Sequence, residues 1–241
     1  MATPSTLNEL YFGALERFAS QPVAVRAKRE GRWIELSYAA LADRVQNLSL
    51  GLLELGIQPG DRVAILSENR PEWAIADYAC LTARYTDVPI YPTLPTKQVE
   101  YCLCDSGAIA ILVSSKHQLE KVATLRQRVP GLTHVISFDP DATGPGVMSL
   151  EQVYALGAAA RSRRSGWMSE AIKAAPGDLA TLIYTSGTTG DMKGVMLTHG
   201  NITYDVTTCC NLFSFRETDE CLSFLPLSHI FERMFGHYSM F

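Results

Sequence analysis

Short apolar segments alternate with longer amphipathic segments between residues 5 and 140, and this alternation constrains the fold more than any other feature. Strands that are joined by helices form right-handed crossovers, which place the strands parallel in one sheet and the helices on its two faces. We therefore expect an α/β fold with a mostly parallel sheet and helices on both faces. The predicted strands are 61–67, 87–92, 108–115 and 133–138, and the predicted helices between them are 68–85, 96–107 and 116–129.

The flanking regions complete this organisation. Helical spacing of apolar residues and a turn at "REG" predict a helix at 5–20, a β-hairpin at 23–38 and a helix at 39–56. A later stretch is richer in Gly, Pro and charge, which is typical of a connecting or peripheral region. The predicted division is an α/β subdomain at 5–140, a linker at 141–177 and a phosphate-loop subdomain at 178–241.

Composition disfavours several classes of protein. A net charge of −4, with 47% hydrophobic and 19% charged residues, is ordinary for a globular protein and argues against nucleic-acid binding. No apolar run reaches the ~20 residues of a membrane span. The N-terminus lacks the pattern of a secretory signal, so we expect a cytoplasmic protein. Its six cysteines are then expected to be reduced core residues, and the spacing of Cys102 and Cys104 argues against a shared metal.

A segment rich in glycine and hydroxyl residues, "YTSGTTGDMKG" at 184–194, follows an apolar run. Glycine lets the backbone approach a ligand closely, hydroxyl and backbone N–H groups donate hydrogen bonds, and Lys193 adds a charge suited to phosphate. The segment matches neither the Walker pattern, because Met192 precedes the lysine and Gly194 follows it, nor the dinucleotide fingerprint. We expect a mobile, solvent-facing phosphate loop at 185–193 between two strands. A flexible surface hairpin is the alternative reading.

Two segments together resemble a known family. The stretch "LIYTSGTTGDMKGVMLTHGN" (182–201) closely resembles the phosphate-binding signature of AMP-forming adenylating enzymes, which include acyl-CoA synthetases, luciferases and adenylation domains. The stretch "LSFLPLSHIFERMFGHY" (222–238) resembles their second core motif in its long-chain fatty acyl-CoA synthetase form, and 60–108 is also similar to those synthetases. The resemblance runs from about residue 5 to the end. It implies the N-terminal part, an incomplete AMP-binding domain, of a longer acyl-adenylate-forming enzyme.

The resemblance implies a reaction and a set of site residues. A long-chain fatty acid is activated by ATP to an acyl-adenylate and transferred to CoA, with Mg²⁺ as cofactor and AMP and pyrophosphate as products. Catalytic roles fall to Lys193 and to His229, which the family places beside the substrate carboxylate and α-phosphate; a capping or core histidine is the alternative for His229. Thr185 is implied near the metal. The residues implied around the β- and γ-phosphates are Ser186, Gly187, Thr188, Thr189, Gly190 and Lys193.

Departures from the family pattern shape the remaining expectations. Met192 stands where the family usually has proline, which puts the stiffness of the loop in question. Later family motifs and a C-terminal domain would lie beyond residue 241, so we expect this chain alone to be catalytically inactive. An uncovered apolar end at 231–241 is expected to favour self-association. Alternatives are another carboxylate-adenylating ligase, a non-catalytic nucleotide- or lipid-binding module, and an unrelated phosphotransferase. Fatty acid, ATP and CoA are the expected partners, with a peripheral membrane contact as a further option.

Three smaller groups complete the predictions. The residues 69–71 are interpreted as a strand-to-helix junction. His199, at the head of a predicted helix, is expected to cap that helix or brace a loop. The arginines Arg161, Arg163 and Arg164 are expected to be a solvated helix end, with a contact to CoA or phospholipid as the alternative.

Overall fold

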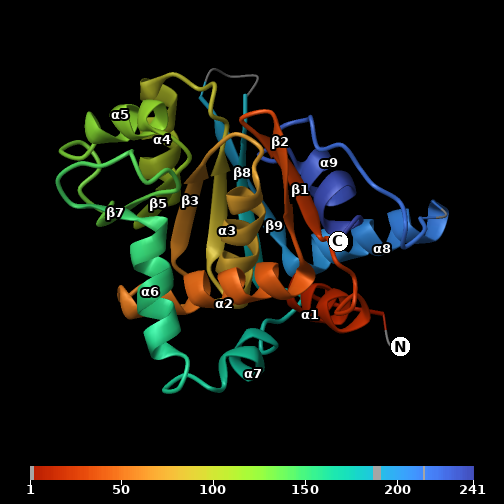
Figure 1. The fold of residues 1–241 in the computed structure, drawn as a ribbon. Helices are drawn as coiled ribbons and strands as arrows, with labels where there is room; N and C mark the ends of the chain where they lie inside the picture. Colours follow the sequence, from red (N-terminus) through yellow and green to blue (C-terminus); the bar gives the residue numbers. More distant parts are fainter. Residues whose placement is uncertain (1–2, 187–190, 214) are drawn as a thin grey trace.

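The computed structural model describes residues 3–186, 191–213 and 215–241. In these ranges the central element is one sheet of seven strands (Figure 1). In spatial order these are β7 (Val147–Ser149), β6 (His134–Ser137), β5 (Ala110–Val113), β3 (Arg62–Leu66), β4 (Thr86–Ile90), β8 (Leu179–Thr185) and β9 (Lys193–Thr198). All neighbouring pairs are parallel except β8 with β9, which pair antiparallel at one edge. The mostly parallel α/β fold expected from the sequence is confirmed.

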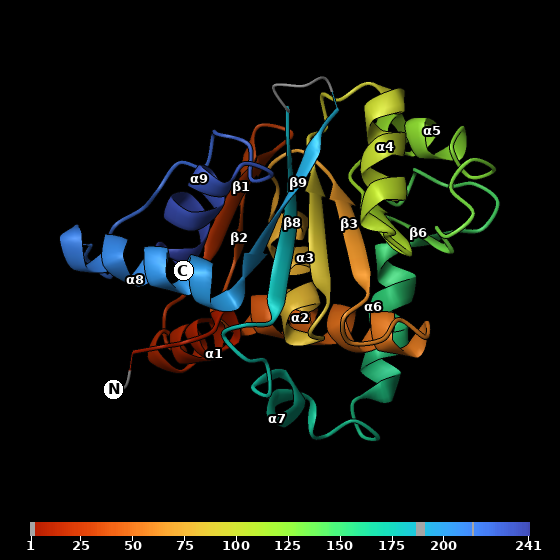
Figure 2. The same ribbon diagram turned by 180° about the vertical axis from the view of Figure 1, so that it is seen from behind.

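Helices cover both faces of this sheet, and a separate antiparallel hairpin stands beside it (Figures 1 and 2). The hairpin consists of β1 (Val25–Arg29) and β2 (Arg32–Leu36). The helices are α1 (Leu7–Arg17), α2 (Tyr38–Glu54), α3 (Pro71–Thr82), α4 (Thr96–Ser106), α5 (Lys116–Ala123), α6 (Leu150–Ala160), α7 (Trp167–Ala171), α8 (His199–Leu212) and α9 (Ile230–Glu232), followed by a π-helical segment, Arg233–Tyr238.

The sheet separates two hydrophobic cores, because alternate residues of a strand point to opposite faces. In β3, Val63 and Ile65 belong to the core beneath α1, α2, α3 and α6, whereas Ala64 and Leu66 belong to the core beneath α4 and α5. All four side chains are fully buried. This two-sided burial explains why the strands read as continuous apolar runs in the sequence.

Local signals in the sequence set the helix boundaries. The side chains of Thr6, Ser37 and Ser115 accept hydrogen bonds from the first turns of α1, α2 and α5. Such caps satisfy backbone N–H groups that the helix itself leaves without partners. Pro71 occupies the first turn of α3, where its missing N–H costs nothing, and Arg70 precedes it as N-cap. The predicted strand-to-helix junction at 69–71 is therefore confirmed.

Two stretches differ from the sequence predictions. The helix predicted at 116–129 ends at Ala123, because the Thr124 hydroxyl bonds the carbonyl of Lys121 and turns with three-residue spacing follow. The predicted linker at 141–177 contains β7, α6 and α7. The division into subdomains stays a prediction, with β8 and β9 lying in the same sheet as the strands of 5–140.

Helices α2 and α6 cross at very short range. A Cβ on Gly157 would lie 1.8 Å from the carbonyl oxygen of Asn47, and one on Gly51 would lie 2.1 Å from that of Val153. Only glycine permits this approach at both positions. The indole N–H of Trp167 then donates to Ser49 on α2 at 2.9 Å. The stretch after β7 is thus packed tightly against the N-terminal helices.

Candidate functional site

The stems of the predicted phosphate loop are the last residues of β8 and the first of β9. Thr185 pairs with Lys193 across the final rung of the antiparallel ladder, and Tyr184 pairs with Gly194. The side chains of Thr185, Ser186 and Lys193 are exposed. Two hydroxyl groups and an ammonium group therefore stand together at the open end of this hairpin, as the prediction of a connection between two strands requires.

Four residues of the predicted loop, the site residues Gly187, Thr188, Thr189 and Gly190, lie outside the described residues. The expected mobility of 185–193 therefore stays a prediction. What the structure places is the two stems, with Thr185 and Ser186 on one side and Met192 and Lys193 on the other.

The second sequence motif lies at the same edge of the sheet as these stems. Asn69 follows the carboxyl end of β3, and its side chain binds the segment 223–227 through three hydrogen bonds. Its amide donates to the hydroxyl of Ser223 at 2.9 Å and to the carbonyl of Leu225 at 2.7 Å, while its oxygen accepts from the N–H of Leu227 at 2.9 Å. Because β8 runs parallel to β4 and β3, Thr185 also lies at the carboxyl edge, where open α/β sheets bind ligands.

His229 caps α9 rather than lying in the core. Its ring is exposed, and its Nδ1 accepts a hydrogen bond from the backbone N–H of Phe231 at 3.2 Å. Because Nδ1 acts as acceptor, the neutral ring carries its proton on Nε2. The capping alternative therefore describes what His229 does in this structure, and the capping bond leaves a donor on the other ring nitrogen.

A buried cluster of charges holds the motif that contains His229. Arg233 is fully buried and donates to the carboxylates of Asp77 on α3 and Asp87 on β4, which are also fully buried. It donates further to the hydroxyls of Thr181 on β8 (2.8 Å) and Tyr238 (3.0 Å). The guanidinium also lies 5.5 Å from the ring centroid of Trp73. One side chain thus ties the segment 230–238 to a helix and two strands.

The two carboxyl groups of this cluster differ in proton affinity. Burial opposes the ionisation of both. At Asp77 the charges of Arg233 and the hydrogen bond from His237, whose Nε2 lies 3.1 Å away, outweigh burial and hold the pKa below its usual range. At Asp87 burial and the neighbouring Asp77 charge outweigh the pull of Arg233 and raise the pKa above its usual range. A single guanidinium therefore serves two buried carboxyl groups whose pKa values are shifted in opposite directions.

Sequence reasoning did not identify Asp77, Asp87 or Arg233, and it assigned Asn69 only to a junction. A signal was present, because Asp77 interrupts the apolar run "AIADYACL" and a buried carboxylate requires a partner. The partner lies 156 residues away, so local pattern could not name it.

The predictions for histidine 199 and for the arginine cluster have clear outcomes. His199 begins α8, but Thr198 caps that helix, and Nδ1 of His199 instead accepts from the backbone N–H of Leu7 at 3.3 Å, so it braces the start of α1 and not a loop. The arginines are at the surface as expected, but each is paired with α2. The pairs are Arg161 with Asp43 (2.6 Å), Arg163 with Glu54 (2.7 Å) and Arg164 with Glu54 (2.8 Å). These pairs give no support to the alternative contact with CoA or phospholipid.

The cysteine and C-terminal predictions were partly wrong. All six cysteines are free, but only two are buried, Cys80 and Cys102; the others are Cys104, Cys209, Cys210 and Cys221. The four cysteines that are not buried lie on outer helix surfaces or in the connection after α8, outside the hydrophobic cores. The end of the chain is also better covered than expected, because Phe241 stacks on Tyr11 with 5.7 Å between ring centroids. Phe231 remains half exposed, and Leu222 and Phe224 are each 75% exposed.

The donors at the stems fit a phosphate-bound Mg²⁺ better than a protein-held metal. Among the described residues, no group of three or more His, Cys, Asp or Glu side chains could hold a metal ion. Thr185 offers a single exposed hydroxyl, and Mg²⁺ characteristically keeps several waters and phosphate oxygens with few protein ligands.

In the part of the chain that the structure describes, no helix is long and apolar enough to cross a membrane.

Comparison with known proteins decides the family. The model of the AMP-binding enzyme family matches residues 14–241. The chain belongs to the AMP-binding enzyme family. It is 35% identical over 206 residues to the long-chain-fatty-acid–CoA ligase FadD15 of Mycobacterium bovis, covering 85% of this chain and 33% of that protein. It is 32% identical over 248 residues to long-chain-fatty-acid–CoA ligase 6 of Mus musculus, covering 95% and 34%. This member of the family spans about a third of the length of these relatives.

Solved structures agree in fold. The long-chain-fatty-acid–CoA ligase FadD1 of Archaeoglobus fulgidus matches with a TM-score of 0.76 at 22% identity, covering 100% of this chain and 46% of that one. The anthranilate CoA ligase AuaEII, solved with anthranoyl-AMP, matches with a TM-score of 0.78 at 19% identity, covering 100% and 44%. The resemblance to adenylating enzymes inferred from the two motifs is confirmed.

Proposed function

We propose that this chain is the N-terminal part of a long-chain fatty acid–CoA ligase, which forms an acyl-adenylate from ATP and a fatty acid and then transfers the acyl group to CoA. The observation that carries the proposal is the pairing of Thr185 with Lys193 at the carboxyl edge of the sheet, in a chain of the AMP-binding family. Its relatives named as long-chain-fatty-acid–CoA ligases support the choice of substrate.

In the proposed reaction the chain binds and orients the phosphates. Lys193 neutralises phosphate charge, and the hydroxyls of Thr185 and Ser186 donate hydrogen bonds, each worth about 1.5–3 kcal/mol when charge-assisted. Nε2–H of His229 is a donor suited to the negative charge that develops on the α-phosphate or the fatty carboxylate. Thr185 would hold Mg²⁺ through its hydroxyl, and the bound ion would supply further neutralisation of the phosphates. No covalent bond to the protein is needed, because holding the reactants in line supplies most of the rate.

The test is ATP–pyrophosphate exchange by the complete ligase that contains these 241 residues. We expect exchange that depends on palmitate and is weak with acetate or an aromatic acid. Exchange supported only by short or aromatic acids would instead favour another carboxylate-adenylating ligase. Nucleotide binding without any exchange would favour a non-catalytic module.

The 241-residue chain gives a second test, because stems that bind phosphate supply little geometry for attack by themselves. We expect it to bind ATP weakly and to form no detectable palmitoyl-CoA with ATP, Mg²⁺, palmitate and CoA, as measured by mass spectrometry. Turnover above a protein-free control would show that the residues assigned here suffice.

A cytoplasmic location and a peripheral contact with membrane lipid belong to the proposal as well, and cell fractionation tests both.

A further inference from the structure

The residues just before Thr185 and Lys193 both face helix α4. Tyr184 ends the buried part of β8, and its hydroxyl donates to a carboxylate oxygen of Asp105 at 2.6 Å. The Tyr184 side chain is 3% exposed, and burial together with the Asp105 charge raises the pKa of its phenol. The phenol therefore stays protonated and keeps its role as donor. This hydrogen bond ties the first stem to the last turn of α4.

Met192 makes the corresponding contact from the second stem. Its sulfur lies 3.9 Å from Sγ of Cys102, one turn from Asp105 on α4, and its side chain packs against the core beneath α4 and α5. Cys102 is fully buried, and burial raises the pKa of its thiol to about 12, so the thiol is the donor. Thioethers are flexible and adapt to irregular gaps, so Met192 can fill this space without strain.

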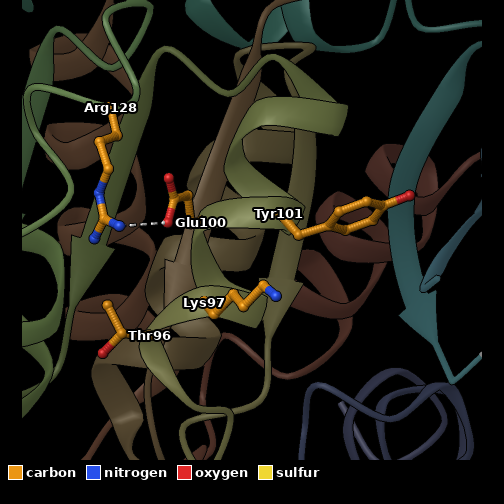
Figure 3. A pocket seen from close by; sticks show the side chains of 5 residues that line it. All are labelled: Thr96, Lys97, Glu100, Tyr101 and Arg128. Carbon is orange, nitrogen blue, oxygen red and sulfur yellow. Dashed lines mark ion pairs between the residues drawn. The ribbon is translucent and has the colours of Figure 1, made fainter. Parts of the chain in front are cut away.

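Aromatic and glycine contacts close the space between the stems and α4. The ring of Tyr101 lies edge-on to that of Tyr184, with 6.4 Å between centroids. Figure 3 shows Tyr101 reaching from α4 toward the edge strands, at one end of a surface groove of about 620 Å³. Across the ladder, a Cβ on Gly194 would lie 3.2 Å from the Tyr184 ring, so glycine leaves room for that ring.

Helix α4 is a firm support for both contacts. Val99, Cys102 and Leu103 are fully buried in its inner face, and a left-handed Gly107 ends the helix. Two contacts of different chemistry thus join adjacent turns of one rigid helix to the two strand ends that carry Thr185 and Lys193. A free hairpin end would have no such support, since β9 is an edge strand whose Met196 is 68% exposed.

We infer that Tyr184 and Met192 are positioning residues, which clamp the two stems to α4 and so fix Thr185 and Lys193 relative to each other. The inference rests on the proposed function for its effect on phosphate binding. The clamp consists of Tyr184–Asp105 and Met192–Cys102.

The experiment compares four variants of the 241-residue chain: Tyr184→Phe, Met192→Ser, Met192→Leu and, as a matched control on the exposed face of α4, Cys104→Ser. Three quantities are measured, namely tripolyphosphate affinity by calorimetry, amide hydrogen exchange over 191–196, and the urea midpoint of unfolding.

We expect Tyr184→Phe and Met192→Ser to weaken tripolyphosphate binding about three- to tenfold, the range for loss of one net hydrogen bond or a comparable contact. Exchange over 191–196 should rise in the same two variants. Met192→Leu keeps an apolar side chain at this contact. The tripolyphosphate affinities of Met192→Leu and Cys104→Ser should therefore stay within about twofold of that of the original chain.

The outcomes separate the clamp from the proposed function. Unchanged exchange over 191–196 in Tyr184→Phe and Met192→Ser would overturn the inference, and so would exchange that rises equally throughout the chain. If the original chain does not bind tripolyphosphate, the phosphate role of the stems fails, while the exchange data alone still decide whether the clamp exists.

Discussion

The two segments that carry the family resemblance are held to the fold in opposite ways. The stems of the predicted phosphate loop, 184–186 and 191–194, lie at the edge of the sheet, and Thr185 and Lys193 are exposed. The segment 230–238 is anchored by Arg233, whose charge is fully buried among two carboxylates. The first segment depends on a ladder and a few contacts with α4, whereas the second depends on ions removed from water.

This difference separates chemistry from anchoring within each motif. Buried ions are costly to desolvate, and they hold their partners firmly once paired and hydrogen-bonded. Arg233 therefore suits a structural role, and the exposed His229 four residues earlier is the group of that motif that can meet a ligand. In the stems the exposed residues are the outermost ones, Thr185 and Lys193, and the residues just inside them, Tyr184 and Met192, make the contacts with α4.

The largest effect on stability is expected from Arg233→Ala. The substitution leaves the buried carboxyl groups of Asp77 and Asp87 without the guanidinium that they share, and breaking a buried ion pair in this way typically costs about 3–5 kcal/mol. Urea unfolding measures the loss, with Arg17→Ala as control, since the pair of Arg17 with Glu217 is exposed and worth at most about 1 kcal/mol. A loss no larger than that of the control would remove the contrast between the two segments.

A pH-dependent effect on the free energy of unfolding, of up to about 3 kcal/mol, is expected from His199, which links the start of α8 to α1. Burial lowers its pKa from 6.5 to about 4, partly offset by Asp178. Between pH 6.5 and 4 the unfolded chain therefore binds a proton at His199 more readily than the folded chain does. The contribution of the neutral His199 to the free energy of unfolding is fully present above pH 6.5 and is lost as the pH falls toward 4. A fall in pKa from 6.5 to about 4 corresponds to roughly 3 kcal/mol of unfolding free energy.

Unfolding free energies of the original chain and of His199→Gln between pH 4 and 7 measure this effect. Other groups titrate in both proteins, so the difference between the two slopes isolates His199. Parallel curves would show that His199 has the same pKa in the folded and the unfolded chain, and that burial does not lower it.

A smaller and more local effect is expected from Asn69→Ala. Three hydrogen bonds to the segment 223–227 are lost, but that segment is largely exposed and water replaces the partners, so the global loss should be about 1–2 kcal/mol. Chymotrypsin should cleave faster at Leu222 and Phe224. Asn47→Ala on α2 serves as the control, and equal cleavage of both variants would mean that Asn69 does not hold the second motif.

The elements of the fold could be predicted because their signals are local. The strand β3 reads as an apolar run, Pro71 indicates the start of a helix, and the glycine and hydroxyl residues before Lys193 predict a connection between two strands. Helix α6 had a signal that was not used, since Ser149 and Gln152 have the spacing of a capping box, which the structure contains.

The features that could not be predicted depend on pairs of residues far apart in the chain. Glycine is required at position 157 because the backbone carbonyl of Asn47 on α2 lies directly opposite. The carboxyl group of Asp87 is buried in the core together with its partner Arg233, which lies 146 residues later in the chain. A single sequence shows that such residues need partners and leaves the partner unnamed. The stems were predicted as a ligand site for their donors, but the contact between Met192 and α4 is also of this long-range kind.

The smallest effect on stability, and the largest on ligand binding, is expected from Lys193→Ala. The Lys193 side chain is exposed at the end of an edge strand and is free of ion pairs within the described residues, so unfolding free energy should change by less than about 0.5 kcal/mol. Loss of a phosphate charge partner is worth more than about 1.4 kcal/mol, so ATP affinity and ATP-dependent adenylation should fall at least about tenfold. Calorimetry with ATP and pyrophosphate exchange measure the two changes, with Lys97→Ala on α4 as a matched surface control. A variant that binds ATP normally would show that the charge at the open end of the hairpin is not directed at phosphate. A variant that also unfolds easily would place Lys193 with Arg233 among the anchors.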